Sequence, residues 1–422
     1  MSQLPQGWEL KTFGDVLSLV TNGVNGKQNK EGVGVPVSRI ETIADQKIDL
    51  NRIGYLESYD EEKIEKYRLQ ENDILFSHIN SALHLGKTAI VPSNVNLYHG
   101  VNLLRLAVNE LAEPRYFNYY CKYFRLLGEF SAHAQHAVNQ SSLNQKKLKA
   151  FNIPLAPIQQ QKSITDKLDS VLAKVEAAQA RLDKIPTTLK RFRQSVLAAA
   201  TSGELTKDWR EENNVVWEPS QSLLGDITEV TGGLTKNSKR GTFPLLKPYL
   251  RVANVYENRI VLDEVKEIGV KEKELSRVTV NHNDLLVVEG NGSIDQIGRV
   301  AIWKSQLEEC VHQNHLIKVR SNPEVINPDF LLYFLMSPIG KQMIREKATS
   351  GAGLYTLSIS KVSSIEVHFP NVAEQLKIVA VIEELFEHAN TVEKQYNAAK
   401  ARLDKLTQSI LAKAFRGELI TS

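Results

Sequence analysis

Polar side chains that can read DNA bases gather in loops after two short β-like runs. "HINSALH" (His78–His84) follows a run that ends near Ser77, and "EGNGSIDQ" (Glu289–Gln296) follows a run that ends near Val288. Asn and Gln match the edge of adenine, Arg and Lys match guanine, and Glu accepts a hydrogen bond from cytosine. Because loops on rigid scaffolds commonly carry recognition, both stretches are candidates for DNA contact. Ordinary solvated turns are polar as well, so composition alone leaves that alternative open.

A second pair of polar loops precedes Leu143 and Leu357, namely "HAQHAVNQSS" (His133–Ser142) and "TSGAGLYT" (Thr349–Thr356). Arg39 and Arg251 follow matching runs, "VPVSRI" and "KPYLRV", and a structural role is open for both. The candidates for base or phosphate contact are Arg39, Ser77, His78, Asn80, Lys87, Gln135, Asn139 and Gln140 in the first half of the chain, and Arg251, Asn254, Glu289, Asn291, Ser293, Arg299, Gly353 and Tyr355 in the second.

Motifs typical of enzymes fail on inspection. "SALHLGKT" (Ser81–Thr88) ends like a phosphate-binding loop, but that motif needs Gly where Ser81 stands. The matching "SIDQIGRV" (Ser293–Val300) lacks both the Lys and the hydroxyl. The pair therefore indicates a shared turn whose basic residue is a candidate for contact with a DNA phosphate. "NPDF" (Asn327–Phe330) lacks the second Pro of the adenine-methyltransferase tetrapeptide, and we expect a helix start there.

Metal and nucleophilic sites are equally incomplete. "CVHQNH" (Cys310–His315) has soft ligands at short spacing, but the matching region of the first half offers only His99. "SAHAQHA" (Ser131–Ala137) is a weaker candidate. Neither paired carboxylates nor a Ser-His-Asp arrangement can be picked out. We expect no catalytic, cofactor or metal site in this chain.

The composition is that of a globular protein. The 422 residues are 42% hydrophobic and 24% charged, which suits two or three packed domains. Two cysteines make a disulfide framework improbable and favour a reducing cytoplasm. No apolar run is long enough to span a membrane. The net charge of +3 permits nucleic-acid binding without arguing for it.

The sequence repeats itself once. "QSVLAAATSGELT" (Gln194–Thr206) returns 214 residues later as "QSILAKAFRGELI" (Gln408–Ile420). Further matches, at offsets that drift from 211 to 214, pair "FGDVLSLVTNG" with "LGDITEVTGG", "LGKTAIV" with "IGRVAIW", and "PRYFNYY" with "PDFLLYF". Another match pairs "RLQENDILFS" with "VTVNHNDLLVV" and places Asp73 opposite Asp284. Two divergent copies of one unit explain this pattern, and the insertions fall in loops.

Each copy ends in a long helix with an apolar seam of period 3.5. The seam residues are Ile164, Leu168, Val171, Val175, Ala178, Leu182, Ile185, Leu189, Phe192 and Val196 in the first helix, and Ile378, Ile382, Leu385, Ala389, Val392, Tyr396, Ala399, Leu403, Leu406 and Ile410 in the second. Such seams predict an antiparallel coiled coil, the alternative being two helices docked on separate cores. Gly203 and Gly417 should end the helices in the left-handed conformation. Pro186 should kink the first helix only, since Lys400 is its counterpart.

The predicted fold is α+β, with two similar globular domains separated by two long helices that form an antiparallel coiled coil, and with a pseudo-twofold internal repeat. The expected bounds are 1–155 and 207–369 for the globular domains, and 156–206 and 370–422 for the helical segments.

The chain resembles the specificity subunits of type I restriction–modification systems over essentially its whole length. The resemblance rests on "LPQGWE" and the weaker "VVWEPS" at the domain starts, on "IPLAPIQQQKSI" and "VHFPNVAEQLKIV" leading into the helices, and on "LKRFRQSVLAAATSGELT" and "LTQSILAKAFRGEL" closing them. One departure is "VHFPN" in place of a double-proline junction.

The resemblance implies that each globular domain is a target-recognition domain reading one half of a split double-stranded DNA sequence. It implies that the helices set the gap between the halves. Two methyltransferase subunits would dock on the helical regions, bind S-adenosylmethionine and methylate adenine N6, and ATP-driven motor–nuclease subunits would cut unmodified DNA. The chain itself would be non-catalytic, and its partners would supply much of the phosphate neutralisation that a modest net charge leaves undone.

Two other function classes stay open on the sequence. A scaffold that uses its helices and domains only for protein contacts would assemble with partners without sequence-dependent DNA protection. A self-contained DNA-modifying enzyme would bind S-adenosylmethionine or ATP as an isolated chain. Calorimetry on the purified chain separates the enzyme from the other two.

Overall fold

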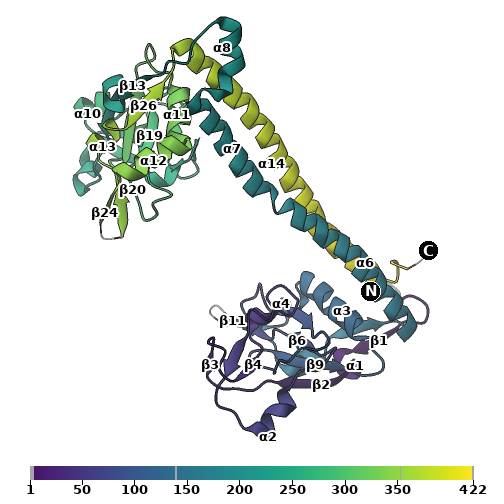
Figure 1. Cartoon of the computed structure of the whole chain (residues 1–422). Helices are drawn as coiled ribbons and strands as arrows, with labels where there is room; N and C mark the ends of the chain where they lie inside the picture. The colour runs from purple at the N-terminus through teal and green to yellow at the C-terminus, as the bar shows by residue number, and fades with distance from the viewer. Residues whose placement is uncertain (1–3, 138–139, 352, 421–422) are drawn as a thin grey trace. The chain divides into compact units, whose positions relative to one another are not determined.

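The chain divides into two compact units that each contain one copy of the repeat. The computed structural model describes residues 4–137, 140–351 and 353–420 (Figure 1). Unit 1 comprises Met1–Asp183 and Asn397–Ser422, and unit 2 comprises Lys184–Tyr396. The last helix, α14 (Val372–Phe415), contributes its first part to unit 2 and its last part to unit 1. Within the described residues, no helix is long and apolar enough to cross a membrane.

A four-stranded antiparallel sheet forms the centre of each unit, with the same strand order in both. The order in unit 1 is β2 (Leu17–Asn22), β9 (Leu104–Val108), β6 (Ile74–Phe76) and β8 (Thr88–Ile90). The order in unit 2 is β14 (Thr228–Gly232), β23 (Leu316–Ser321), β19 (Leu285–Val288) and β21 (Val300–Ile302). Every residue of β6 and β19 is buried, because these inner strands are covered on both faces.

The smaller sheets close each unit at its edges. Strands at the two ends of each globular domain pair with each other, β1 (Glu9–Thr12) with β12 (Asn152–Leu155) and β13 (Ser220–Leu223) with β26 (Glu366–Phe369). Peripheral sheets differ between the copies. Unit 1 has one sheet of three strands in the order β3 (Gln28–Asn29), β5 (Gly54–Leu56) and β4 (Val35–Val37). Unit 2 has a sheet in the order β18 (Lys266–Val270), β15 (Leu245–Leu250) and β22 (Val311–His312), and a separate pair of β16 (Val255–Tyr256) with β17 (Arg259–Ile260). The pairing of first and last strands brings both domain ends to the start of a long helix.

Helices begin where the sequence predicted them, at Pro114 and Pro328. Glu113 caps α3 (Pro114–Leu126), and Asn327 caps α11 (Pro328–Met336) by accepting from the backbone N–H groups of Asp329 and Phe330. The predicted helix start at "NPDF" is therefore confirmed. The other short helices are α1 (Phe13–Val16), α2 (Glu61–Ile64), α4 (Glu129–Ala132), α5 (Gln145–Lys149), α8 (Lys207–Asn213), α9 (Leu224–Ile227), α10 (Glu272–Val278), α12 (Pro338–Lys347), α13 (Ile359–Ser363), and the 3-10 turns η1 (Ile40–Ile43), η2 (Glu65–Tyr67), η3 (Glu204–Thr206), η4 (Ser238–Thr242) and η5 (Val252–Asn254).

The first long helical segment is interrupted and the second is continuous. Helix α6 (Ile158–Leu182) ends two residues before α7 (Ile185–Ser202) begins, and Pro186 occupies the first turn of α7. Proline has no N–H to donate and its ring clashes with the preceding turn, so the break falls directly before it. Helix α14 continues through Lys400 for 44 residues. The disturbance predicted for the first helical segment alone is thus present as an interruption next to Pro186, and a kink angle stays a prediction.

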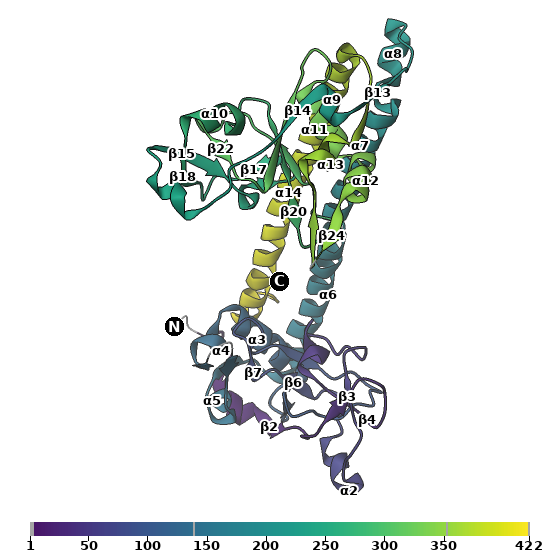
Figure 2. The same ribbon diagram turned by 90° about the vertical axis from the view of Figure 1, so that its left-hand side faces the viewer.

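Within each unit the long helices pack in opposite directions. In unit 1, Ile164 and Leu168 near the start of α6 share a core with Ile410 and Phe415 near the end of α14. In unit 2, Val196 and Leu197 near the end of α7 share a core with residues near the start of α14, and α7 and α14 lie alongside each other in both views (Figures 1 and 2).

The guanidinium of Arg193 also bridges α7 to α14, at 2.9 Å from Asn390 Oδ1 and 2.8 Å from Glu393 Oε2. The antiparallel pairing is therefore confirmed.

The alternative of separate docking also describes part of the arrangement, because the helix ends are built into the domain cores. Part of the seam is covered less than its period predicts. Phe192, Val392 and Leu406 remain 38%, 42% and 44% exposed. A heptad pattern fixes which face is apolar, whereas its burial depends on how closely a second surface approaches.

A buried glutamine fastens each long helix to its own domain. Gln161, in α6, accepts from the N–H of Glu113 at 2.8 Å and donates to the carbonyls of Leu111 and Ala156. Its counterpart Gln375, in α14, accepts from the N–H of Asn327 at 2.7 Å and donates to two further carbonyls. Since both side chains are fully buried, each bond is made away from competing water. The first turns of the long helices are thereby locked to the starts of α3 and α11.

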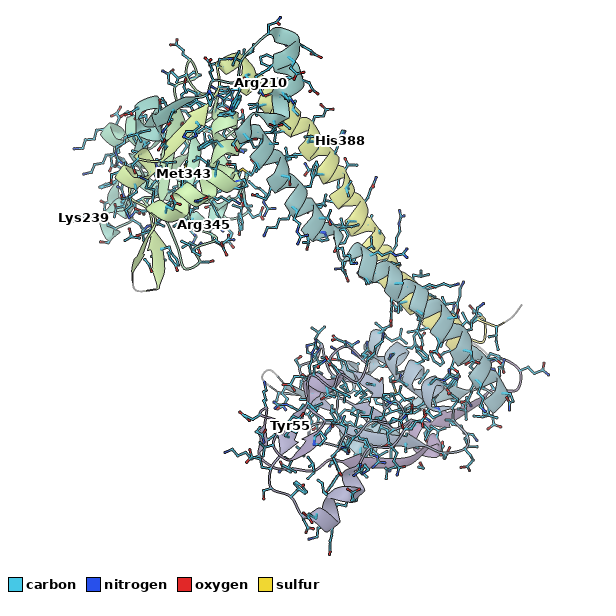
Figure 3. All side chains as sticks on the ribbon, viewed as in Figure 1. Tyr55, Arg210, Lys239, Met343, Arg345 and His388 are labelled. Atoms are coloured by element: carbon cyan, nitrogen blue, oxygen red, sulfur yellow. The ribbon has the colours of Figure 1, made fainter. Side chains whose placement is uncertain are left out.

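Glycine ends both helical segments next to a tryptophan. Gly203 and Gly417 have φ of +83° and +78°, as the sequence predicted. A Cβ at Gly203 would lie 2.6 Å from the Trp217 ring, and one at Gly417 would lie 2.6 Å from Pro5 Cγ and 3.6 Å from Trp8. Beside Trp217, Arg210 lies where α8 meets the start of α14 and bonds Glu374 at 2.6 Å (Figure 3). Left-handed backbone and close packing both require glycine here.

The Gly417→Ala substitution should destabilise unit 1 more than Gly128→Ala does. Both residues have φ near +80°, so either alanine costs about 1–2 kcal/mol of backbone strain. Gly128 faces open space, whereas the Gly417 Cβ would overlap Pro5, which adds about 1–3 kcal/mol. Urea unfolding of the two variants measures the difference. Equal losses would show that Pro5 and Trp8 do not pack against this turn in solution.

Candidate nucleic-acid interface

The two predicted loop pairs meet in one small sheet in each unit. Hairpin sheet 1 consists of β7 (Ile79–Asn80), β11 (Gln140–Ser142) and β10 (Gln135–Ala137). Hairpin sheet 2 consists of β20 (Gly290–Asn291), β25 (Leu354–Thr356) and β24 (Thr349–Gly351). The β24–β25 hairpin projects from the rest of unit 2 (Figures 1 and 2). Loops some 60 residues apart in sequence thus form one surface.

The hairpin sheets are anchored to the central sheets by matching main-chain bonds. The N–H of Leu143 donates to His78 O, and that of Leu357 donates to Glu289 O, both at 2.8 Å. His78 and Glu289 directly follow Ser77 and Val288, the last residues of the two central runs. The main-chain bonds that anchor the hairpin sheet are therefore the same in both units, while the residue whose carbonyl accepts the bond is histidine in one unit and glutamate in the other.

The basic residue of the shared turn is half-buried and contacts another part of its own domain in both units. Gly86 and Gly298 take the left-handed conformation, with φ of +74° and +67°. The ammonium of Lys87 donates to the carbonyl of Ala44, and burial lowers the pKa of Lys87. The Arg299 guanidinium lies over the Tyr256 ring, 5.5 Å from its centre. The shared turn is confirmed, and phosphate contact by Lys87 or Arg299 stays a prediction.

Three further candidates have internal partners that give them a structural role. The N–H groups of Arg39 and Arg251 donate to Thr42 Oγ1 and Asn254 Oδ1, which caps η1 and η5. Asn254 is buried and its amide nitrogen donates to Val261 O at 2.9 Å. The Arg251 guanidinium donates to Glu264 O at 2.8 Å, while the Arg39 guanidinium is 3.4 Å from the carboxylate of its neighbour Glu41. Asn254 has no free amide edge to offer a base in this conformation.

His78 and Glu289, at matched positions, have different surroundings. His78 is 8% exposed, its Nδ1 has no hydrogen-bond partner in the described part of the chain, and burial lowers its pKa to about 4. Its imidazole is therefore neutral at pH 7. Glu289 is partly exposed, and its carboxylate lies 3.0 Å from His315 Nδ1. The residue that anchors the hairpin sheet is thus an uncharged histidine in one domain and a glutamate in the other.

The serine and asparagine candidates shape their loops. The amide of Asn80 donates to Ser77 Oγ at 3.2 Å and accepts from the N–H of Ser81. Asn291 accepts from the N–H of Ser293 at 2.9 Å. Ser77 is buried, and it lines with Asn80 and Lys87 a cavity of about 210 Å³. Both asparagines remain partly exposed.

The hairpin candidates are the most accessible of the set. Gln135 and Gln140 are exposed, Tyr355 is half-buried against the core of unit 2, and Gly353 has φ of +78° with open space around it. Asn139 lies outside the described residues. The structure thus brings Asn80, Gln135 and Gln140 together in one sheet and Asn291, Gly353 and Tyr355 in the other.

The "CVHQNH" stretch does not assemble a metal site in the described part of the chain. Cys310 and His312 are both buried, and His312 Nδ1 is hydrogen-bonded to Val278 O at 2.9 Å. Burial lowers the pKa of His312 to about 4. Among the described residues no three His, Cys, Asp or Glu side chains converge as metal ligands.

Comparison with known proteins agrees with this doubled architecture. The family model described as the type I restriction modification DNA specificity domain matches twice, at residues 5–187 and 214–399. The chain belongs to this family. The sequence-based identification as a type I specificity subunit, the α+β fold and the internal repeat are thereby confirmed.

Curated relatives match across almost the whole chain. It is 30% identical to the StySPI specificity subunit of Salmonella potsdam over 99% of this chain and 90% of that protein. It is also 30% identical, with the same coverage, to the EcoKI specificity subunit of Escherichia coli K12. A putative specificity subunit of Methanocaldococcus jannaschii is 31% identical over 96% of this chain and 94% of that protein.

Solved structures share the fold at low sequence identity. A chain from a structure of a type I restriction–modification system superposes with a TM-score of 0.68 at 16% identity, covering 99% of this chain and all of that one. The specificity subunit HsdS of Thermoanaerobacter tengcongensis gives 0.57 at 16% identity, over 99% of this chain and 98% of that one.

Sequence reasoning missed an ion pair at the start of an inner strand in each central sheet. It matched Asp73 with Asp284 but assigned neither a role. Asp73 pairs with Arg105 at 2.8 Å, whereas Asp284 pairs with Arg320 at 2.7 Å, two positions further along the equivalent strand. Lys318 occupies the place of Arg105 and donates to the carbonyls of Arg277 and Thr279. An acidic residue recurring in both copies before a buried run was the available signal.

Lowering the pH from 7 to 5 should destabilise unit 1 through His78. An unfolded histidine takes a proton near pH 6.5, whereas folded His78 resists until about pH 4, so the unfolded state binds more protons between those values. The contribution of neutral His78 to the free energy of unfolding is fully present above pH 6.5. It falls as the pH drops, by about 2 kcal/mol at pH 5. His99 contributes in the same direction.

The contribution of His78 is isolated by comparing wild type with His78→Leu in urea unfolding at several pH values. The variant should lose part of the pH dependence and keep the part due to His99. Identical slopes for the two proteins would mean that the His78 imidazole reaches water.

Proposed function

We propose that this chain reads a two-part sequence in double-stranded DNA, each globular domain contacting one half. The domains have the proposed bounds 1–155 and 207–369. Membership in the specificity family supports the proposal, and one structural observation carries it. The two hairpin sheets share strand order, anchoring bonds and register, yet differ in almost every outward side chain. A common frame with different surface chemistry suits two readers of different bases.

The two-stranded form of the hairpins agrees with this role. A two-stranded antiparallel ribbon fits the major groove, where each base pair presents a distinct pattern of donors and acceptors. Exposed amides, hydroxyls and one carboxylate lie on or beside the sheets, while main-chain bonds anchor the sheets to the rest of each domain. Rigid support of this kind lets a side chain discriminate between bases instead of adapting to each.

The helical segments, with proposed bounds 156–206 and 370–422, act as a spacer between the halves. Support comes from the antiparallel packing in each unit and from the buried glutamines that lock the helix starts to the domains. Because an α-helix rises 1.5 Å per residue and is stiff over tens of ångströms, helix length converts directly into spacing.

The chain works in this proposal as a non-catalytic member of a complex. Two methyltransferase subunits bring S-adenosylmethionine and methylate adenine N6, and motor–nuclease subunits bring ATP and cut unmodified DNA. The relatives named above are specificity subunits of type I restriction enzymes, which supports this division of labour. A net charge of +3 also fits a reader whose partners neutralise much of the DNA phosphate charge.

Methylated-adenine mapping tests the function directly. A host that expresses this chain with its methyltransferase partner should methylate one interrupted motif, and a host with the partner alone should not. Calorimetry should find no binding of S-adenosylmethionine by the chain alone. Partner assembly without any motif-specific methylation would favour a scaffold instead, and binding of S-adenosylmethionine by the isolated chain would favour an enzyme.

Lengthening both helical segments together should widen the unread gap. Four residues inserted into α6 and four at the facing part of α14 add about 6 Å, equivalent to one or two base pairs. The mapped motif should keep both half-sites and gain that many unread positions. The matched control inserts the residues in α6 alone, which shifts the apolar stripes out of register and should reduce methylation altogether. An unchanged gap in the double insertion would reject the spacer.

A further inference from the structure

The outward rows of the two hairpin sheets differ in the base chemistry that they can recognise. In hairpin sheet 1, Gln135 lies opposite Ser142 and Ala137 lies opposite Gln140. In hairpin sheet 2, Thr349 lies opposite Thr356 and Gly351 lies opposite Leu354. Side chains directly opposite each other in an antiparallel pair, and those two residues along, share one face. Each hairpin therefore presents one row of four residues, called row 1 and row 2 below, and Gly351 leaves row 2 with three side chains.

The opposite faces of the sheets are partly engaged by the protein itself, although His136 and Ser350 are exposed there. His136 bonds Ser141 Oγ at 2.8 Å and Ser131 O at 3.0 Å, and Asn80 is bonded to Ser77. In unit 2, Tyr355 packs against the core. Rows 1 and 2 are thus the faces with more side chains available to an external ligand. Their residues are exposed, apart from the half-buried Ser142.

Row 1 offers free amides. Gln135 and Gln140 are both exposed, and within the described part of the chain neither side chain donates or accepts a hydrogen bond. A glutamine amide carries two donors and one acceptor, which together match N6 and N7 at the major-groove edge of adenine. Two such amides, at neighbouring positions on the same face, make adenine the base that this row fits best.

Row 2 replaces those amides with methyl groups. Leu354 stands at the position of Gln140 and is 45% exposed. Thr349 stands at the position of Gln135, and its hydroxyl accepts from the ammonium of Lys361. This leaves the Leu354 side chain and the Thr356 methyl as the accessible apolar groups of the row. In the major groove the apolar feature of a base pair is the C5-methyl group of thymine.

We propose that Gln135 and Gln140 read adenine in the first half-site, and that Leu354 reads a thymine C5-methyl group in the second. The inference rests on the proposed function and assigns the chemistry by which each hairpin works. Leu354 is the decisive residue, because a water-exposed leucine at the position of a free glutamine gains nothing from solvent and gains from covering a methyl group. Packing of Leu354 against a partner subunit is the competing outcome.

The test uses the chain assembled with its methyltransferase partner and duplexes carrying the mapped motif. Each thymine of the second half-site is replaced in turn by deoxyuridine, which removes only the C5-methyl group. One replacement should weaken binding by about 3–10-fold for the wild type, as expected for burial of a single methyl group. Leu354→Ala should bind the unmodified duplex equally weakly and show no further loss with deoxyuridine. Replacements in the first half-site should act independently of Leu354.

A matched experiment examines row 1. Replacing an adenine of the first half-site by 7-deazaadenine removes N7 and should weaken binding by the wild type. Gln140→Ala should already bind the unmodified duplex weakly and should lose no further affinity when the adenine is replaced. The double exchange Gln140→Leu with Leu354→Gln should move the deoxyuridine sensitivity from the second half-site to the first.

The outcomes separate this inference from the proposed function. A complex that does not distinguish its motif from a scrambled duplex sinks the proposed function itself. A complex that does distinguish them, but tolerates deoxyuridine at every position of the second half-site or has no thymine there, overturns the inference alone. Loss of partner assembly in Leu354→Ala, measured by size-exclusion chromatography, would assign Leu354 to a protein contact and also overturn it.

Discussion

The arrangement depends on burial of apolar stripes between helices that run in opposite directions. At one end of the seam Ile164 and Leu168 pack with Ile410, and at the other Val196 packs with Ile378 and Ile382. Neither end is an isolated coiled coil, because each is continuous with a domain core. Association of the helices and folding of the domains are therefore the same event, driven by the same removal of apolar surface from water.

Polar groups then fix each long helix in place on its own domain. Burial of a stripe tolerates sliding, but a buried glutamine with three bonds has only one satisfactory position, and moving it would leave backbone groups unpaired in the core. Gln161 and Gln375 do this at the helix starts, and the tryptophan-packed glycines do it at the helix ends. The hairpin sheets are joined to the central sheets by main-chain bonds, from Leu143 to the carbonyl of His78 and from Leu357 to the carbonyl of Glu289. Recognition chemistry can consequently vary between the copies without disturbing the frame.

The long helices, their ends and the break between α6 and α7 could be predicted because each depends on a local sequence pattern. Apolar periodicity identified the long helices, glycine marked their ends, and Pro186 marked the break, since each acts through the backbone of its own segment. The repeat doubled the weight of each observation. Family membership followed from the phrases that open and close the helices.

Other features depend on contacts between distant segments, and no local pattern announces them. Strands β7 and β20 are two residues long and exist only because a hairpin some 60 residues away pairs with them. The sequence predicted that Lys87 and Arg299 face a DNA phosphate. Tertiary packing directs Lys87 to the carbonyl of Ala44 and Arg299 over the Tyr256 ring. Asn254 was predicted to contact a base because its residue type is suited to that role. The sequence does not indicate that its amide donates to the carbonyl of Val261. Side-chain type limits the chemistry of a residue, and the fold decides what it faces.

The most direct measurement of the central claim is exchange of one domain. Residues 207–369 are replaced by the corresponding domain of a relative with a different motif, and methylated adenines are mapped in a host that carries the methyltransferase partner. The account predicts a hybrid motif in which the second half-site changes while the first half-site and the gap are retained. A motif in which both half-sites change, or in which the gap changes although the helices do not, would contradict it.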